Sequence, residues 1–171
     1  NTDGSTLFQV NAGVRIVGGA SRGTGTKKHS FRLTFKGMYG PTTLDYPIFD
    51  DTDIDSFNTV TFRAGFNDTF WGGTMLQDRW AAERQIAAGG LGPHGRFVHL
   101  YIDGLYWGLY NPLERTDDAF AASYLGGEKE DYDYYTNQGI AGGNSTAWNL
   151  LHSLANDAVG NYAAIEEMLD I

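Results

Sequence analysis

The sequence contains no cysteine among its 171 residues, which excludes disulfides, thiolate metal sites and a cysteine nucleophile. No apolar run reaches the roughly 18 residues that a membrane-spanning helix needs, so no membrane span is expected. Basic residues are few, because 12 Lys and Arg stand against 21 Asp and Glu, for a net charge of −9. The chain therefore lacks the positive field of a nucleic-acid-binding or polybasic lipid-binding protein, and we expect neither partner.

Apolar and aromatic residues are plentiful, at 42% and 14%, so the chain can bury a sizeable core. Its length suits one domain, 1–171. The chain begins at Asn1 rather than Met, and a helical pattern that Asn161 can cap runs into Ile171 without a glycine stop. This pattern favours a truncated domain whose chain continues; a short terminal helix is the alternative.

Two segments, 8–16 and 31–35, alternate between apolar and polar residues with the period of a half-buried strand, and a third strand is expected over 57–63. A glycine-rich loop over 18–30 separates the first two, which predicts a hairpin. Asp-Gly within 97–110 lies between two β-rich runs and predicts a second hairpin with a type I′ turn.

Helical patterns follow these strands. Thr74 and Gln77 have the spacing of a capping box and predict a helix over 74–88, with Met75, Leu76, Trp80, Ile86 and Ala87 on its buried side. Thr116 predicts the start of a short helix, and the spacing of Trp148, Leu151, Ala155 and Ala158 predicts another. With strands concentrated in 6–110 and helices in 111–171, the sequence predicts an α+β fold with a mostly antiparallel sheet.

The glycine-rich loop contains Gly19-Ala20-Ser21-Arg22-Gly23, which matches the pattern of a hydrolase nucleophile elbow. That motif requires a helix after the turn, whereas another strand is expected here, so a serine hydrolase is disfavoured. Backbone amides of such a loop could instead cradle a phosphate. A flexible hairpin tip without a ligand is the third interpretation.

Basic residues continue from this loop into the second strand. Lys28 and Arg32 share parity, and therefore a strand face, if the strand begins near residue 28. Glu83, on the helix over 74–88, could then pair with Lys28, as a strand lysine and a helix glutamate do in protein kinases. A solvated basic strand face and an ordinary surface glutamate are the alternative.

Metal-binding patterns are incomplete. Asp51, Asp53 and Asp55 have the spacing of a calcium loop, but Ser56 replaces the required glycine and Phe62 the terminal glutamate. The four histidines lack metal-ligand spacing, so no metal ligand is assigned.

Several strings in order resemble the spore coat protein H family, the CotH kinase-like proteins of bacteria. They span most of residues 14–155 and comprise Lys28-His29-Ser30-Phe31-Arg32-Leu33, Leu44-Asp45-Tyr46-Pro47-Ile48-Phe49, Arg63-Ala64-Gly65-Phe66-Asn67-Asp68, Asp78-Arg79-Trp80, Gly95-Arg96-Phe97-Val98-His99-Leu100-Tyr101, Gly104-Leu105-Tyr106-Trp107-Gly108-Leu109-Tyr110-Asn111, Glu114-Arg115 and Gly126-Gly127-Glu128-Lys129-Glu130-Asp131-Tyr132-Asp133.

The resemblance implies an atypical protein-kinase-like fold that binds ATP with Mg²⁺ and phosphorylates Ser or Thr of other proteins, in a secreted, cell-surface or spore-surface setting in bacteria. The strands and the helix over 74–88 would form the small lobe. Lys28 would bind phosphate with Glu83 as its partner, and residues 101–114 would lie near adenine. The nucleotide-binding residues implied are Lys28, Arg32, Ser21, Arg22, Glu83 and Glu114.

The sequence departs from the family in one respect. The family's catalytic Asp and its metal-binding Trp-Asp segment follow the matched region, whereas Trp148 is followed here by Asn149-Leu150-Leu151. We therefore expect residues 1–171 alone to be inactive, with a missing C-terminal half or self-association covering apolar residues such as Trp148, Leu151 and Leu169. A non-catalytic surface or coat module with the same fold is the alternative function.

Overall fold

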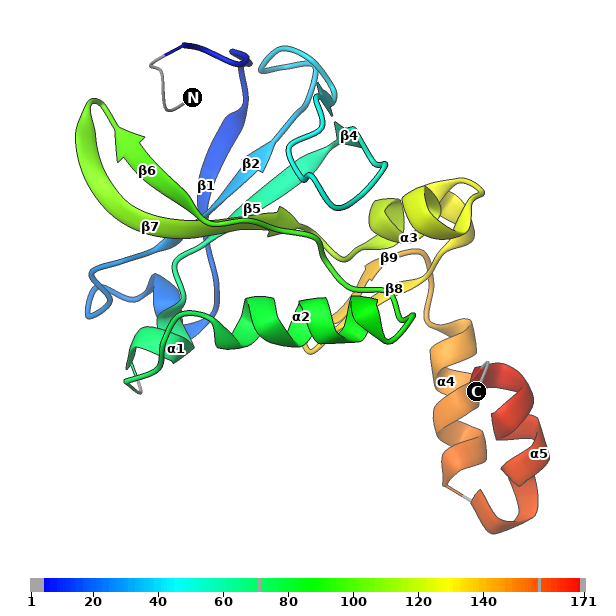
Figure 1. Cartoon of the computed structure of the whole chain (residues 1–171). Coiled ribbons are helices and arrows are strands. Elements are labelled where there is room, and N and C mark those ends of the chain that lie inside the picture. The colour runs from blue at the N-terminus through cyan, green and yellow to red at the C-terminus, as the bar shows by residue number, and fades with distance from the viewer. Residues whose placement is uncertain (1–4, 71, 157, 170–171) are drawn as a thin grey trace. The chain divides into compact units, whose positions relative to one another are not determined.

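The computed structural model describes residues 5–70, 72–156 and 158–169 and divides the chain into two compact units, Asn1–Thr116 and Asp117–Ile171. The first unit carries a five-stranded antiparallel sheet with two helices, and the second carries helices and a small hairpin (Figure 1). The predicted α+β class with a mostly antiparallel sheet is confirmed.

The sheet of the first unit has the order β1-β2-β5-β7-β6. Its strands are β1 (Gly13–Val17), β2 (Ser30–Thr34), β5 (Thr59–Arg63), β6 (Val98–Ile102) and β7 (Leu105–Glu114). The predicted first strand is longer than the observed β1, because β2 ends at Thr34 opposite Gly13 and gives residues 8–12 no strand to pair with. The loop between β1 and β2 includes a short 3-10 helix, η1 (Ala20–Arg22).

The two predicted hairpins are both present. β1 and β2 pair antiparallel, and so do β6 and β7. Asp103 and Gly104 connect β6 to β7 with φ values of 50° and 78°, the left-handed geometry of a type I′ turn. The Asp-Gly signal therefore determines this turn directly from the sequence.

The two faces of the sheet differ in chemistry. On one face, Arg32 lies opposite Thr61 in the register of β2 and β5; on the other, Leu33 lies opposite Val60. The apolar face carries the core, which β3 (Leu44–Asp45) and β4 (Ser56–Phe57) help to cover. The buried core residues are Phe35, Leu44, Phe49, Phe57 and Val60.

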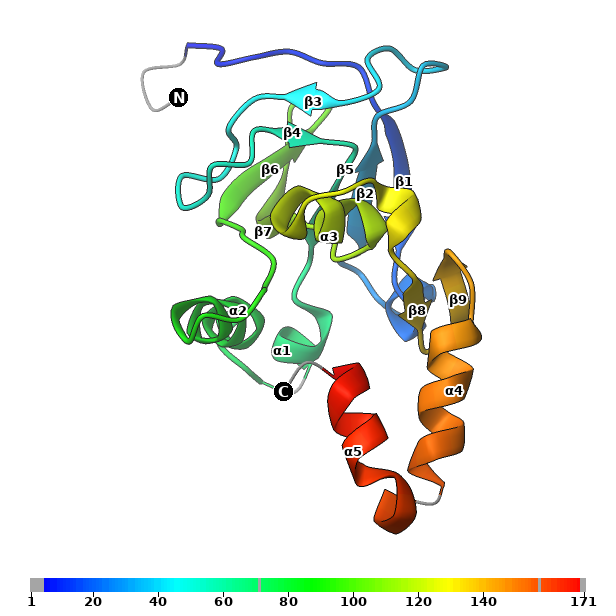
Figure 2. The same cartoon turned by 90° about the vertical axis from the view of Figure 1, so that its right-hand side faces the viewer.

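Two helices lie on the opposite side of the sheet from β3 and β4, below it in Figures 1 and 2. They are α1 (Phe66–Phe70) and α2 (Gln77–Ala87). The predicted capping box is wrong: α2 begins after Leu76, and its Gln77 amide donates to a carboxylate oxygen of Asp68 at 3.2 Å. The first amide of α2 is thus capped by the Asp68 carboxylate of α1, and not by the Thr74 side chain that the capping-box prediction assigned to this role.

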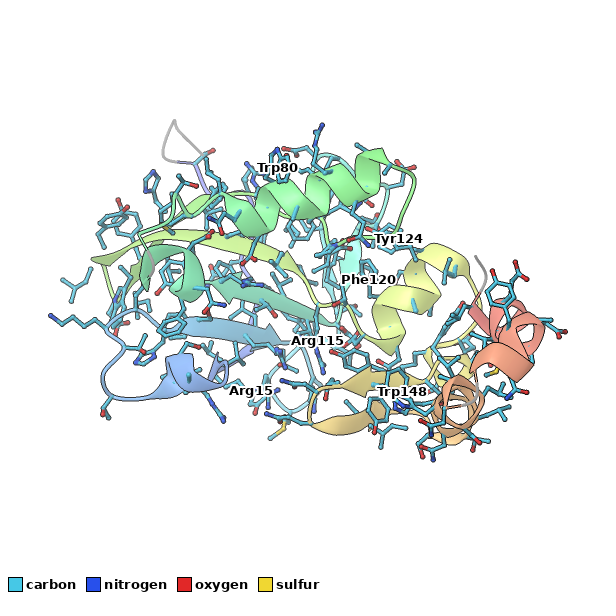
Figure 3. The ribbon with its side chains drawn as sticks, turned by 90° about the horizontal axis from the view of Figure 1, so that it is seen from below. Arg15, Trp80, Arg115, Phe120, Tyr124 and Trp148 are labelled. Carbon is cyan, nitrogen blue, oxygen red and sulfur yellow. The ribbon has the colours of Figure 1, made fainter. Side chains whose placement is uncertain are left out.

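The buried side predicted for this helix is right only in part, because Met75 and Ile86 are half-buried but Leu76, Trp80 and Ala87 are exposed. Trp80 and Leu76 expose 63% and 54% of their surface, whereas the buried residue of the helix is Arg79. The Arg79 guanidinium donates to the Pro93 carbonyl at 2.8 Å and pairs with Glu83, so a charged side chain replaces the expected apolar contact. Figure 3 shows Trp80 on α2 and Arg15 at the other edge of the same unit.

The second unit comprises α3 (Asp118–Leu125), η2 (Lys129–Asp131), β8 (Tyr134–Thr136), β9 (Gly139–Gly142), α4 (Thr146–Ala155) and α5 (Ala158–Leu169). Asp117, rather than Thr116, caps α3 by accepting from the Phe120 amide at 3.2 Å. Asn161 has non-helical dihedral angles inside α5, and Ile171 lies outside the described residues. Trp148 and Leu169 expose 41% and 43% of their surface, and self-association through them stays a prediction.

Among the described residues, none of the helices combines the length and apolarity that crossing a bilayer requires.

Candidate functional site

A pocket of about 390 Å³ lies beneath the glycine-rich loop on the polar face of the sheet. Three parts of the first unit enclose it: the loop, the facing residues of β2 and β5, and the turn into α1. Its lining is Val17, Gly18, Gly19, Ala20, Ser21, Ser30, Arg32, Thr61, Arg63, Gly65, Phe66 and Asn67. Antiparallel pairing of β2 with β5 puts the polar residues of both strands side by side, so residues that are far apart in the sequence line the same pocket.

The loop over the pocket has a defined conformation. Gly18 has a φ of 126°, and a Cβ at this position would collide with the Ser21 hydroxyl, so only glycine fits. The Ser21 carbonyl lies 2.8 Å from Nδ1 of His29 at the far end of the loop. This hydrogen bond joins the two ends of the loop and keeps Ser21 beside the pocket.

The wall that the sheet provides is cationic. Arg32 and Arg63 both line the pocket, and Arg15 on β1 lies directly opposite Arg32 in the strand register. Like charges at directly opposed positions of a sheet repel each other, so an anion bound between them would relieve that repulsion. Ser30 holds this wall together, since its hydroxyl accepts from the Ala64 amide at 2.9 Å.

An ion pair connects this wall to α2. The Arg63 guanidinium, at the end of β5, pairs with the Asp78 carboxylate in the first turn of the helix. Both side chains are about half exposed, at 41% and 48%, so Arg63 can keep Asp78 as a partner and still face the pocket. The pair couples the position of α2 to a residue of the pocket.

Of the predicted nucleotide-binding residues, the structure brings Ser21 and Arg32 to the pocket. Lys28 precedes β2, which begins at Ser30, so the expected shared strand face with Arg32 does not form. The Lys28 ammonium instead donates to the Leu109 carbonyl at 2.5 Å and lies 4.7 Å from the Tyr110 ring centroid. Burial lowers the pKa of Lys28 from its ordinary value near 10.5.

The predicted ion pair of Lys28 with Glu83 is wrong. Glu83 pairs with Arg79 one turn earlier on α2, at 3.2 Å, because the buried guanidinium of Arg79 is its nearest cation on the same helix face. Glu114 is buried on β7, where it accepts from the His94 amide at 2.8 Å, and Arg22 ends η1 at an exposed position. Neither is part of the pocket lining, and the nucleotide roles of these residues stay predictions.

Sequence reasoning missed Arg63, Thr61 and Asn67. Arg63 could have been found, because it shares parity with Thr61 in the third strand and ends that strand just before the helical region. Asn67 belongs to one of the family strings, but nothing in the sequence placed it beside the loop, since its approach depends on the turn at Gly65, whose φ is 69°.

This arrangement suits binding of a phosphorylated ligand. Two guanidinium groups, the Ser21 hydroxyl and a glycine-rich backbone surround a pocket large enough for a small molecule. Among the described residues, no three His, Cys, Asp or Glu side chains are grouped to hold a metal ion, so we assign no residue to Mg²⁺.

An α+β domain with a glycine-rich hairpin over a basic pocket is thus the class that fold and site define. A family model described as CotH kinase protein matches residues 14–171. The chain belongs to this family, and the resemblance stated from the sequence is confirmed. A search of curated proteins gives no match.

Proposed function

We propose that this chain is the nucleotide-binding portion of a CotH-type protein kinase, and that ATP places its phosphates in the pocket under the glycine-rich loop. The observation that carries the proposal is the pairing of a glycine-rich loop with two arginines, Arg32 and Arg63, on the strands beneath it. The charge-assisted hydrogen bonds of guanidinium groups to phosphate oxygens are short and directional, so these residues would fix the phosphates in one orientation.

The connection to α2 supports the same function. In protein kinases, a strand cation that contacts phosphate pairs with a carboxylate on the following helix. Arg63 and Asp78 have this relationship, with the cation on the central strand of the sheet. We therefore assign to Arg63 the phosphate-orienting role that the family resemblance implied for Lys28.

Further features follow from family membership as proposals. The complete domain would use ATP with Mg²⁺ to phosphorylate a Ser/Thr-rich protein, in a secreted or surface setting in bacteria. Residues 1–171 alone would bind nucleotide without transferring phosphate, since the family's metal-binding Trp-Asp segment has no counterpart after Trp148.

Titration of the chain with a fluorescent ATP analogue tests the proposal. We expect R32Q and R63Q each to weaken ATP about tenfold or more, with a smaller effect on ADP and almost none on adenosine. R84Q removes an exposed arginine of α2 outside the pocket lining and serves as the matched control. Equal affinity for ATP and adenosine, or unchanged ATP affinity in both pocket variants, would contradict the proposed site.

A second candidate is a surface module that binds partners without nucleotide chemistry. The hairpin of β6 and β7 favours it, because Tyr101 and Tyr106 are 61% and 55% exposed and their ring centroids lie 5.2 Å apart. Exposed tyrosines are common at sites that bind proteins. A rise in melting temperature with Mg-ATP would favour the kinase proposal, and no rise in the chain or a longer parent would favour this one.

A further inference from the structure

A second cavity lies on the opposite face of the sheet, away from the pocket under the glycine-rich loop. It has a volume of about 270 Å³ and is lined by Leu33 of β2, Val60 and Phe62 of β5, and Val98 of β6. Val60 and Phe62 alternate along β5 with Thr61 and Arg63, which line the first pocket. The two sites therefore use opposite faces of one strand and are chemically independent.

The walls of this cavity are almost entirely carbon. Ile48 and Phe49, from the segment between β3 and β4, form one side, and the amino-terminal residues Leu7 and Phe8 form another. The Phe8 ring packs against Tyr46 at a centroid distance of 4.6 Å. Water gains little in such a space, because it needs two to four polar partners to be held there. An apolar ligand is therefore the occupant that the walls favour.

The size of the cavity limits that ligand. A cavity of about 150 Å³ with similar walls holds benzene. The larger volume here admits a substituted aromatic ring or a short acyl chain, but it is below the usual range for a drug-sized ligand.

The lining of this cavity includes one cationic side chain, that of Arg96. Arg96 contributes to the cavity wall, and its backbone amide is fixed by donation to the Pro112 carbonyl at 3.1 Å. Its guanidinium is half exposed and makes two long contacts, at 3.5 Å to the Ile48 carbonyl and at 3.5 Å to the exposed Asp50 carboxylate. A ligand carboxylate at the shorter distance typical of a charge-assisted hydrogen bond would displace both contacts favourably.

We propose that this cavity binds a small amphipathic carboxylate, with an apolar chain or ring against Leu33, Phe62 and Val98 and the carboxylate at Arg96. Apolar walls supply affinity through burial of carbon surface. The single guanidinium selects a negatively charged head group over a neutral or positive one. The inference is independent of nucleotide binding, because it uses neither Arg32 nor Arg63.

Binding of three ten-carbon probes to the chain, all below micelle-forming concentration, tests this proposal. We expect decanoate to bind with roughly five- to tenfold higher affinity than decanol, and decyltrimethylammonium to bind weakest. R96Q should remove the preference for decanoate, because it should weaken decanoate binding more than decanol binding. R84Q keeps Arg96 and should retain the preference.

Nuclear magnetic resonance of the Leu and Val methyl groups in the unmodified chain locates the probe without any substitution. Decanoate should shift the methyl signals of Leu33, Val60 and Val98, with those of Val14 and Leu105, which lie outside the lining, as internal controls. Saturable shifts confined to the control methyls, or no saturable shift, would overturn the site. Equal affinity for decanoate and decanol would overturn the carboxylate selectivity.

Discussion

Arg63 on β5 and Asp78 on α2 form an ion pair that ties the central strand of the sheet to the first turn of that helix. Arg63 also lines the pocket, so one guanidinium serves both a structural contact and a candidate phosphate contact. Because both side chains remain about half exposed, solvent screens their attraction, and the pair contributes little to stability. Its importance should lie in ligand binding.

Substitution of this pair separates the two roles. R63Q and D78N should each lower the free energy of unfolding by less than about 1 kcal/mol in urea titrations, with a coupling of the same order in the double variant. ATP affinity should fall about tenfold in R63Q and much less in D78N, because only Arg63 is proposed to contact phosphate. An equal loss in both variants would mean that Arg63 acts by positioning α2.

The loop conformation makes a second prediction. G18A places a Cβ at a φ of 126° and against Ser21, so it should destabilise the chain by about 1–3 kcal/mol or distort the loop, and weaken ATP binding. G25A is the matched control, since a Cβ there meets nothing within 4 Å. Thermal unfolding and nucleotide titration measure the two effects, and equal behaviour of both variants would show that the loop does not need the Gly18 geometry.

Burial of Arg79 makes a third prediction. R79M should lower the free energy of unfolding by about 2 kcal/mol, because the Pro93 carbonyl loses its donor and α2 loses its anchor. R84M, at an exposed position of the same helix, should change it by less than about 0.5 kcal/mol. Chemical denaturation compares them, and similar small losses would mean that Arg79 does not hold the helix.

The lowered pKa of Lys28 makes stability depend on alkaline pH. Between the folded-state pKa and about 10.5, the unfolded chain binds more protons at this site, so Lys28 makes stability rise with pH. Burial raises the pKa of Tyr110 above its ordinary value near 10. From about pH 10 upward, the unfolded chain therefore binds fewer protons at this tyrosine, and Tyr110 makes stability fall with pH. K28M keeps Tyr110, so the difference in the free energy of unfolding between the unmodified chain and K28M reports the pH dependence that Lys28 contributes.

Urea denaturation at pH 7 and at about pH 10.5, the ordinary pKa of a lysine, measures this dependence over the whole window. The stability of the unmodified chain relative to K28M should increase over that interval. K27M removes the neighbouring exposed lysine and should follow the unmodified chain. A constant difference between the unmodified chain and K28M would show that the Lys28 amine is not desolvated.

Local patterns predicted much of the fold. Alternation identified β1 and β2, and Asp103-Gly104 identified the turn between β6 and β7, because these signals depend on neighbouring residues alone. The start of α2 was misplaced because its first amide is satisfied by Asp68, whose approach requires the turn between α1 and α2. Its buried side was misjudged in part because Arg79, with partners at Pro93 and Glu83, is buried in place of Trp80.

The candidate site was predicted in part. Ser21 and Arg32 were identified from the glycine-rich loop and the strand that follows it, and both line the pocket. The expected partner of Glu83 was wrong, since a helix neighbour, Arg79, competes with any residue on the sheet. Arg63 was quoted in a family string but given no role in the site, because its place in the pocket depends on the pairing of β5 between β2 and β7.

The sequence by itself determined the α+β class, the two hairpins and the family, because alternation, turn residues and ordered motifs are properties of the chain read locally. Tertiary structure alone decided which cations share a pocket and which carboxylates they pair with. Those choices depend on strand order, register and helix placement, which bring together residues as distant as Ser21 and Arg63. Electrostatic partners act over a few ångströms in space, and separation along the chain does not fix that distance.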